Sequence, residues 1–194
     1  MKEVLLLLTD HWADWEASYA IAGLNATEQY AVKTISVDAQ PKESIGGLRT
    51  EIDYTLQNYQ GFDNLAMVIL PGSFSWGEER YNAVADFVKK ATDLSIPVAA
   101  ICGATLFLAR HGFFNSIKHT GDTQEYFFEN LEDEKGYAGH DHFVAAQVVV
   151  DNGFITANET AAVDFAYEIF KVLKMDSDEE INGWYDGFKH GMIQ

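Results

Sequence analysis

Short apolar runs and helical stripes alternate along this chain. Runs rich in apolar or β-branched residues, typical of strands buried in a sheet, occur at residues 3–9, 30–37, 65–70 and 96–101. Segments typical of helices lie between or after them, at residues 14–27, 82–94, 104–110 and 159–173, with Asp14 as the expected N-cap of the first. Strands that alternate with helices predict an α/β fold, with a mostly parallel sheet covered on both faces.

Two segments predict antiparallel pieces. Residues 44–55 hold Gly46-Gly47 among β-prone residues, which indicates a small hairpin or an excursion from the sheet. Asn152-Gly153 lies between the apolar runs 143–150 and 154–157, and Asn-Gly in that setting is a strong hairpin signal. The expected sheet is therefore mostly, but not wholly, parallel.

The composition is that of an ordinary globular protein, with 194 residues, 47% of them hydrophobic, and one cysteine. A single cysteine excludes an internal disulfide, so nothing indicates an oxidising compartment. The apolar run at residues 3–9 is too short for a signal peptide or a membrane span, and we expect a cytoplasmic protein. The net charge of −17 argues against nucleic acid or an anionic membrane as a partner. The sequence has no Gly-rich phosphate loop, so no cofactor is expected.

The single cysteine, Cys102, lies where a strand should turn into a helix, directly before Gly103. A side chain on such a sharp turn projects above the sheet, and backbone N–H groups at the helix start point towards it, as in a nucleophile elbow. The positive end of the helix favours the thiolate, which predicts a thiol pKa below the free value. The alternative is a small buried hydrophobe, because free cysteine is often fully buried.

Glu16 follows the first predicted strand, on the opening turn of the first helix. The carboxyl ends of the central strands of a doubly wound sheet converge on one crevice, so Glu16 and Cys102 should meet there. An ionised carboxylate would disfavour the thiolate, whereas a protonated, partly buried one donates a hydrogen bond to it. We therefore predict that Glu16 tunes Cys102 rather than acting as its general base. The alternative is a surface group that complements the helix dipole.

A Pro-Gly turn, residues 71–72, follows the predicted strand 65–70 and is itself followed by Ser73. A turn after a central parallel strand can present backbone N–H groups to a developing negative charge. Those of Ser73 and Gly103 would together form a two-donor oxyanion site. The alternative is a plain turn without a chemical role.

Among the six histidines, His119 is the candidate partner of Cys102. It lies 17 residues beyond the cysteine, in a possible short strand at residues 117–120, from which it could return to the crevice. The alternative is a surface histidine. His140 and His142 resemble a fragment of a metal site, but a third ligand would have to come from elsewhere, and no metal is predicted.

Together these motifs resemble the ThiJ/PfpI family of the class I glutamine amidotransferase-like superfamily. The resemblance rests on Glu16 and on three segments, residues 68–72 (VILPG), 100–104 (AICGA) and 152–157 (NGFITA). It covers residues 1–174, which form one predicted domain, with residues 175–194 as a C-terminal helical extension.

The resemblance implies a flavodoxin-like three-layer sandwich, usually dimeric, in which Glu16 hydrogen-bonds a reactive Cys102. It also implies an oxyanion-like pair of N–H groups at Ser73 and Gly103, and His119 matches by its distance a histidine found near the cysteine in some members. The protease-like branch carries histidine directly after the nucleophile, where this chain has Gly103. That departure argues against proteolysis by a Cys-His pair. The second glycine usual after Pro-Gly is Ser73 here, which keeps the N–H and adds a hydroxyl to the pocket.

A last helix is predicted at residues 178–192. It carries Trp184, Tyr185, Phe188 and Met192 at roughly helical spacing, more apolar surface than a small solvated helix needs. We expect these side chains to pack on the domain or on a second subunit. The family's tendency to dimerise and the prevalence of two-fold dimers make a homodimer the prediction.

Three functions compete. The first is a hydrolase or lyase that uses Cys102 on a small carbonyl, amide or peptide substrate, as the resemblance to a family of peptidases, amidases, glyoxalase-like and deglycase-like enzymes implies. The second is a stress-response or redox-sensing protein in which Cys102 is oxidised to a sulfinate. The third is a non-catalytic, chaperone-like dimer. Enzyme and sensor share the thiolate, so the sequence barely separates them.

Overall fold

The computed structural model describes residues 1–131 and 135–191. In that part of the chain seven strands form one sheet, in the order β5-β2-β1-β6-β7-β9-β8. Neighbouring strands are parallel except β8 and β9. The bounds are β1 Lys2–Leu7, β2 Tyr30–Ser36, β5 Tyr54–Thr55, β6 Leu65–Leu70, β7 Val98–Ile101, β8 Val148–Asp151 and β9 Phe154–Ala157. The predicted mostly parallel sheet is confirmed.

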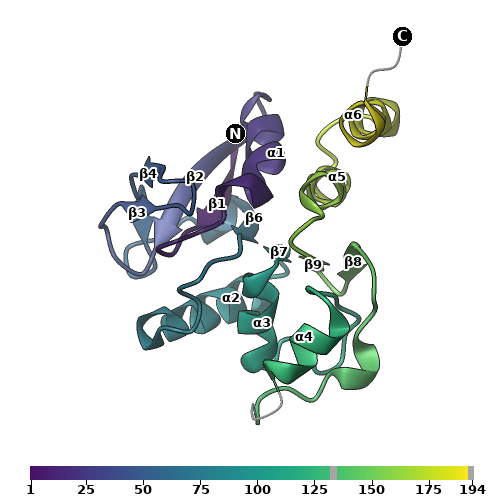
Figure 1. Cartoon of the computed structure of the whole chain (residues 1–194). Helices are drawn as coiled ribbons and strands as arrows, with labels where there is room; N and C mark the ends of the chain where they lie inside the picture. Colours follow the sequence, from purple (N-terminus) through teal and green to yellow (C-terminus); the bar gives the residue numbers. More distant parts are fainter. Residues whose placement is uncertain (132–134, 192–194) are drawn as a thin grey trace.

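Helices cover both faces of the sheet (Figure 1). One layer contains α1 (Asp14–Asn25) and α5 (Ala162–Leu173), with α6 (Asp178–His190) packed on α5; the other contains α2 (Ala83–Asp93), α3 (Gly103–Arg110) and α4 (Gln124–Glu129). The central strand order, β2-β1-β6-β7-β9, is that of a flavodoxin-like sandwich, with a crevice where the order reverses between β1 and β6. No described helix has both the length and the apolar character that crossing a membrane requires.

The side chains of β1 show why the central strands are apolar throughout. Leu5 and Leu7 enter the layer beneath α2 and α3, whereas Val4 and Leu6 enter the layer beneath α1 and α5. All four are buried, because a parallel strand with helices on both faces has no solvent side. Continuous apolar runs therefore identified these strands in the sequence.

The hairpin predicted at Asn152-Gly153 is present, and the segment predicted as a hairpin or an excursion at residues 44–55 is a hairpin that begins two residues earlier. β3 (Lys42–Glu43) and β4 (Arg49–Thr50) form a separate antiparallel pair. β8 and β9 are joined through Asn152 and Gly153, whose φ values of 44° and 82° are the left-handed backbone that a two-residue hairpin turn requires.

The segments before this hairpin are less regular than predicted. Residues 143–147 lie outside β8, and residues 117–120 contribute only an isolated bridge between His119 and Phe143. Phe143 packs its ring against His119 and Phe127 instead of joining a strand. Side-chain packing, rather than the local preference for β structure, therefore determines the conformation of these segments.

Asp14 does not cap α1, and that prediction was wrong. Ala13 occupies the N-cap position and provides no side-chain cap. The Asp14 carboxylate accepts hydrogen bonds from the Ser44 hydroxyl and from the Gly46 N–H (3.0 Å) instead. It therefore ties the β3–β4 loop to the start of α1.

The aromatic face of α6 packs on its own chain. The Trp184 ring lies 4.8 Å from that of Phe170 and 6.2 Å from that of Tyr19, and the Phe188 ring lies 5.3 Å from that of Tyr19. Phe188 nevertheless remains 55% exposed. Met192 lies outside the described residues. Packing on the domain accounts for Trp184, and the homodimer stays a prediction.

Candidate active site

Cys102 lies at the turn between β7 and α3, as predicted. Its φ of 55° and ψ of −129° are unfavourable for a residue with a side chain, a strain of about 1–3 kcal/mol. Hydrogen bonds hold the turn: the Cys102 N–H donates to the Ala157 carbonyl (3.0 Å), and its carbonyl accepts from the Thr105 N–H (2.9 Å). The strained turn keeps the half-buried thiol at the carboxyl edge of the sheet.

Glu16 lies in the first turn of α1 and is fully buried. Its Oε2 accepts a 2.6 Å hydrogen bond from the Gly72 N–H, whereas Oε1 has no partner of ordinary hydrogen-bond geometry among the described residues. Glu16 and Cys102 both crowd Gly72, where an added Cβ would lie 2.8 Å from Oε2 and 2.9 Å from the Cys102 Cβ. The structure therefore brings the two predicted residues together.

The Glu16 carboxyl holds its proton unusually tightly. Burial raises the pKa of Glu16 to about 8, although hydrogen bonds from the Gly72 N–H and the Cys102 thiol act in the opposite direction. The carboxyl is therefore mostly protonated at neutral pH. A proton-bearing carboxyl beside the thiol can donate to a thiolate, which is the tuning role that the sequence suggests.

The backbones of Ser73 and Gly103 lie close together. A Cβ on Gly103 would be 3.6 Å from the Ser73 nitrogen. In the described part of the chain neither N–H donates to a protein oxygen, and a hydrogen bond from the Gly103 N–H stabilises the Cys102 thiolate. The Ser73 hydroxyl is not free in the pocket, because it donates to the Asp10 carbonyl (2.6 Å).

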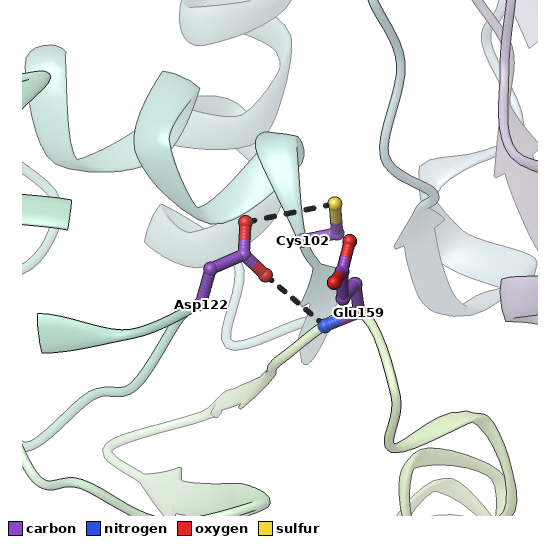
Figure 2. A group of neighbouring side chains, drawn as sticks. All are labelled: Cys102, Asp122 and Glu159. Carbon is purple, nitrogen blue, oxygen red and sulfur yellow. Dashed lines mark hydrogen bonds between the residues drawn. The ribbon is translucent and has the colours of Figure 1, made fainter. Parts of the chain in front are cut away.

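Asp122 is a site residue that sequence reasoning missed. It lies in the irregular segment before α4, and the Cys102 thiol donates to its Oδ2 at 3.8 Å (Figure 2). Its Oδ1 accepts a 3.1 Å hydrogen bond from the Glu159 N–H, and burial raises its pKa. In the sequence Asp122 directly precedes Thr123, the N-cap of α4, and an aspartate is common at the start of a helix. Nothing local marks it as a partner of the cysteine.

His119 does not pair with Cys102, and that prediction was wrong. The ring is fully buried, with Nδ1 hydrogen-bonded to the Ile117 carbonyl (2.9 Å) and Nε2 to the Tyr137 hydroxyl (2.8 Å). It stacks on Phe114 with the ring centres 4.9 Å apart. Burial lowers the pKa of His119, so the ring is a neutral core group with both nitrogens already engaged.

The thiol pKa is also shifted against the prediction. Burial raises the pKa of Cys102, and the negative charges of Glu16 and Asp122 raise it further, while the Gly103 N–H opposes them. The effect of the helix start is therefore outweighed by burial and by acidic neighbours. Because Glu16 is mostly protonated at neutral pH, we assign the electrostatic part mainly to Asp122.

Asp122→Asn should consequently speed alkylation of Cys102 at neutral pH. Removing the charge lowers the thiol pKa, and we expect a rate about fivefold higher once the lower intrinsic nucleophilicity is included. Iodoacetamide labelling reports this, because Cys102 is the single cysteine. Glu28→Gln is the matched control, since exposed Glu28 precedes β2 at the opposite edge of the sheet. Equal rates in Asp122→Asn and wild type would contradict the assignment.

A cavity of about 530 Å³ opens above the thiol. Its lining includes Cys102, Glu16, Ser73 and Gly103, the four predicted site residues that the structure brings together, and Asp122. Most of the remaining lining is apolar or aromatic. Size and lining are those of a small-molecule site.

Three potential metal ligands also lie here. The donor atoms of Cys102, Asp122 and Glu159 are all within 4.8 Å of one another (Figure 2). A thiolate with carboxylates suits zinc or a softer ion, but the raised thiol pKa disfavours the thiolate that such an ion needs. His140 and His142 are not part of this group in the described chain.

Comparison with known proteins identifies the family. Residues 2–172 match the sequence profile of the DJ-1/PfpI family. The chain belongs to the DJ-1/PfpI family. This confirms the resemblance to ThiJ/PfpI proteins, and the match ends within α5, before α6.

Similar proteins span nearly the whole chain. Two from Bacillus subtilis (strain 168) are named uncharacterized protease YdeA, 37% identical over 183 residues (93% of this chain, 88% of the relative), and uncharacterized protease YoaZ, 31% identical over 191 residues (95% and 89%). A thiJ/pfpI family protein from Bacillus anthracis superposes with a TM-score of 0.86 at 30% identity, covering 97% of this chain and 90% of its own. A DJ-1 superfamily protein from Agrobacterium tumefaciens also gives 0.86, at 26% identity, covering 98% and 100%. The flavodoxin-like sandwich is confirmed.

Proposed function

We propose that this protein is a cysteine-dependent hydrolase or lyase that acts on a small carbonyl, amide or peptide substrate. The main support is the position of Cys102, on a strained turn within a cavity and beside the N–H groups of Ser73 and Gly103. Membership of the DJ-1/PfpI family supports a cysteine enzyme or a stress protein at the family level.

The proposed reaction begins with attack of the Cys102 sulfur on a substrate carbonyl carbon. As the C–S bond forms, the thiol proton passes to Asp122, whose Oδ2 already accepts the S–H hydrogen bond. The carbonyl oxygen gains negative charge, which the N–H groups of Ser73 and Gly103 stabilise. With an amide, the amine then leaves with a proton and water releases the acid; with an aldehyde, the first adduct is a hemithioacetal.

A substrate panel tests this proposal. Dicarbonyl, amide and peptide substrates are assayed with wild type and with Cys102→Ser. We expect turnover of at least one class, reduced at least about a thousandfold in the variant because the nucleophile is lost. Unchanged turnover in Cys102→Ser would exclude the thiol as nucleophile.

Redox sensing is the second candidate function, and the protonated Glu16 carboxyl favours it. Peroxide oxidises a thiolate through a sulfenic to a sulfinic acid. A sulfinate at Cys102 would lie beside the Glu16 carboxyl, whose Oε1 has no ordinary partner among the described residues. Stoichiometric oxidation of Cys102 without turnover of any substrate in the panel would favour this function over the enzyme.

General protease activity should be weak or absent. A Cys-His peptidase needs an imidazole within about 2.6–3.2 Å of the thiol. Gly103 occupies the position after the nucleophile, and both nitrogens of His119 are engaged in the core. Casein and fluorogenic peptide assays measure the activity. Robust cleavage that disappears in Cys102→Ala would show that another group serves as the base.

We further propose a homodimer, to which residues 175–194 contribute as a C-terminal extension. Phe188 and Tyr19 leave an exposed aromatic surface where α6 meets α1. Repulsion between subunits of net charge −17 is screened beyond about 8 Å at physiological salt. Light scattering should give twice the chain mass of 21.7 kDa. A mass of one chain at micromolar concentration would refute the dimer.

A further inference from the structure

The cavity above Cys102 carries negative charge that the protein does not neutralise. Asp122 and Glu159 both line it, and within the described ranges neither forms an ion pair and no lysine, arginine or histidine joins the lining. Some half-buried carboxylates elsewhere in the chain do have a cation beside them: Asp164 lies 2.6 Å from Lys189. The cavity therefore holds two carboxylates that no cationic side chain of the described residues neutralises.

Glu16 adds to the same cavity a buried carboxyl oxygen without a hydrogen-bond partner among the described residues. It is fully buried and lines the cavity, yet its Oε1 has no partner of ordinary hydrogen-bond geometry in the described chain. A buried carboxyl oxygen without a donor is unfavourable. A ligand whose cationic N–H group reached this oxygen would supply a partner and would lower the pKa of Glu16 towards the ionised form.

Three exposed aromatic rings complete the lining. Trp15 from α1, Phe74 from the loop after β6 and Tyr126 from α4 are 47%, 82% and 48% exposed. Large apolar rings are rarely left in water on three separate elements around one cavity without a binding role. Aromatic faces attract cations, and carboxylates beside them reinforce that preference.

We propose that this cavity recognises a cationic ligand, a small molecule that carries an ammonium or guanidinium group held by Asp122 and Glu159 against the aromatic rings. The inference rests on the proposed function and deepens it, because it names the class of substrate that Cys102 would meet. Neutral ligands would use the rings alone, and anionic ligands would face uncompensated repulsion.

Three methanethiosulfonates of similar size test the proposal on the intact protein, one bearing trimethylammonium, one sulfonate and one no charge. In each case the Cys102 thiolate attacks the sulfenyl sulfur, a mixed disulfide forms and methanesulfinate leaves. The chemistry is the same, so the ratio of rates is independent of the thiol pKa. Because Cys102 is the single cysteine, mass spectrometry follows this site alone. We expect the cationic reagent to react at least about tenfold faster than the anionic one.

Variants distinguish the effect of the charges in the cavity from the effect of the net charge of the whole chain. The ratio of the labelling rate with the cationic reagent to that with the anionic reagent should fall at least about threefold in Asp122→Asn and in Glu159→Gln. Each substitution removes one negative charge beside the thiol. Glu28→Gln removes the same charge at the far edge of the sheet and should leave the ratio unchanged. Two independent variants keep the test decisive if one of them fails to fold. A ratio near one in wild type, or equal ratios in all variants, would overturn the proposal.

The labelling result is separable from turnover. If the ratio is near one while the substrate panel shows Cys102-dependent turnover, the charge preference is wrong and the proposed enzyme stands. If the cationic reagent is preferred but no substrate turns over, the cavity binds cations and the proposed enzyme is wrong.

Discussion

As the pH rises from the ordinary carboxyl value of 4.5 to about 8, the wild-type protein should lose stability that a Glu16→Gln variant keeps. Burial raises the pKa of Glu16 in the folded state, so the folded chain binds this proton more tightly than the unfolded chain. Stability from the group is therefore fully present below the unfolded pKa and is lost as the pH rises through the folded one. The shift corresponds to a difference of about 4 kcal/mol between the two ends of this window.

Urea unfolding across this pH range measures the effect. The free energy of unfolding of Glu16→Gln should fall less with pH than that of wild type, because glutamine has no proton to lose. Glu28 is an exposed glutamate, and the control variant Glu28→Gln should follow the wild-type curve. Cys102 does not contribute within this window, since its pKa is raised above the ordinary thiol value of 9.0. Parallel curves for wild type and Glu16→Gln would show that Glu16 is ionised in the folded protein.

The same buried proton connects stability with chemistry. At physiological pH the burial of the Glu16 carboxyl lowers the stability of the folded protein, yet this carboxyl lies beside the strained, half-buried Cys102. Local conflicts of this kind are expected at functional sites, where positioning of reacting groups opposes the best packing. The stability cost and the proposed role of Glu16 thus have one physical origin, its burial against Cys102.

The central fold could be predicted because its signals are local. Buried parallel strands appear as unbroken apolar runs, and the run at residues 65–70 coincides with β6, Leu65–Leu70. Asn152 and Gly153 encode their own turn through a left-handed backbone. Residues 143–147 were misassigned because their conformation depends on aromatic packing with distant residues, which a short sequence window does not contain.

The site residues likewise fall into two groups, those that the order of the strands places and those that it does not. Cys102, Glu16 and Ser73 follow the ends of central strands, so topology alone brings them together. Asp122 and His119 lie in an irregular segment without periodic pattern, where three residues of separation decide which side chain reaches the thiol. The direction of the thiol pKa shift could not be predicted either, because the burial of Cys102 and its contact with Asp122 arise only when the chain folds.

His119→Ala should destabilise the protein by about 3–4 kcal/mol through loss of buried ring packing and of hydrogen bonds to groups left unpaired. The ring stacks on Phe114, and its nitrogens bond the Ile117 carbonyl and the Tyr137 hydroxyl. Urea unfolding measures the loss. His119→Phe keeps the ring but loses both hydrogen bonds, and we expect it to recover part of the packing energy.

Reactivity distinguishes this structural role from a catalytic one. Without urea both variants are expected to be folded. Iodoacetamide should then alkylate Cys102 in His119→Ala and in His119→Phe at the wild-type rate, because neither ring nitrogen of His119 is hydrogen-bonded to the thiol. Asp122→Asn, in contrast, should change that rate with little loss of stability, since its partners are a thiol and one backbone N–H. Slower alkylation in folded His119→Phe, with an unchanged rate in Asp122→Asn, would mean that the histidine rather than the aspartate governs the thiol.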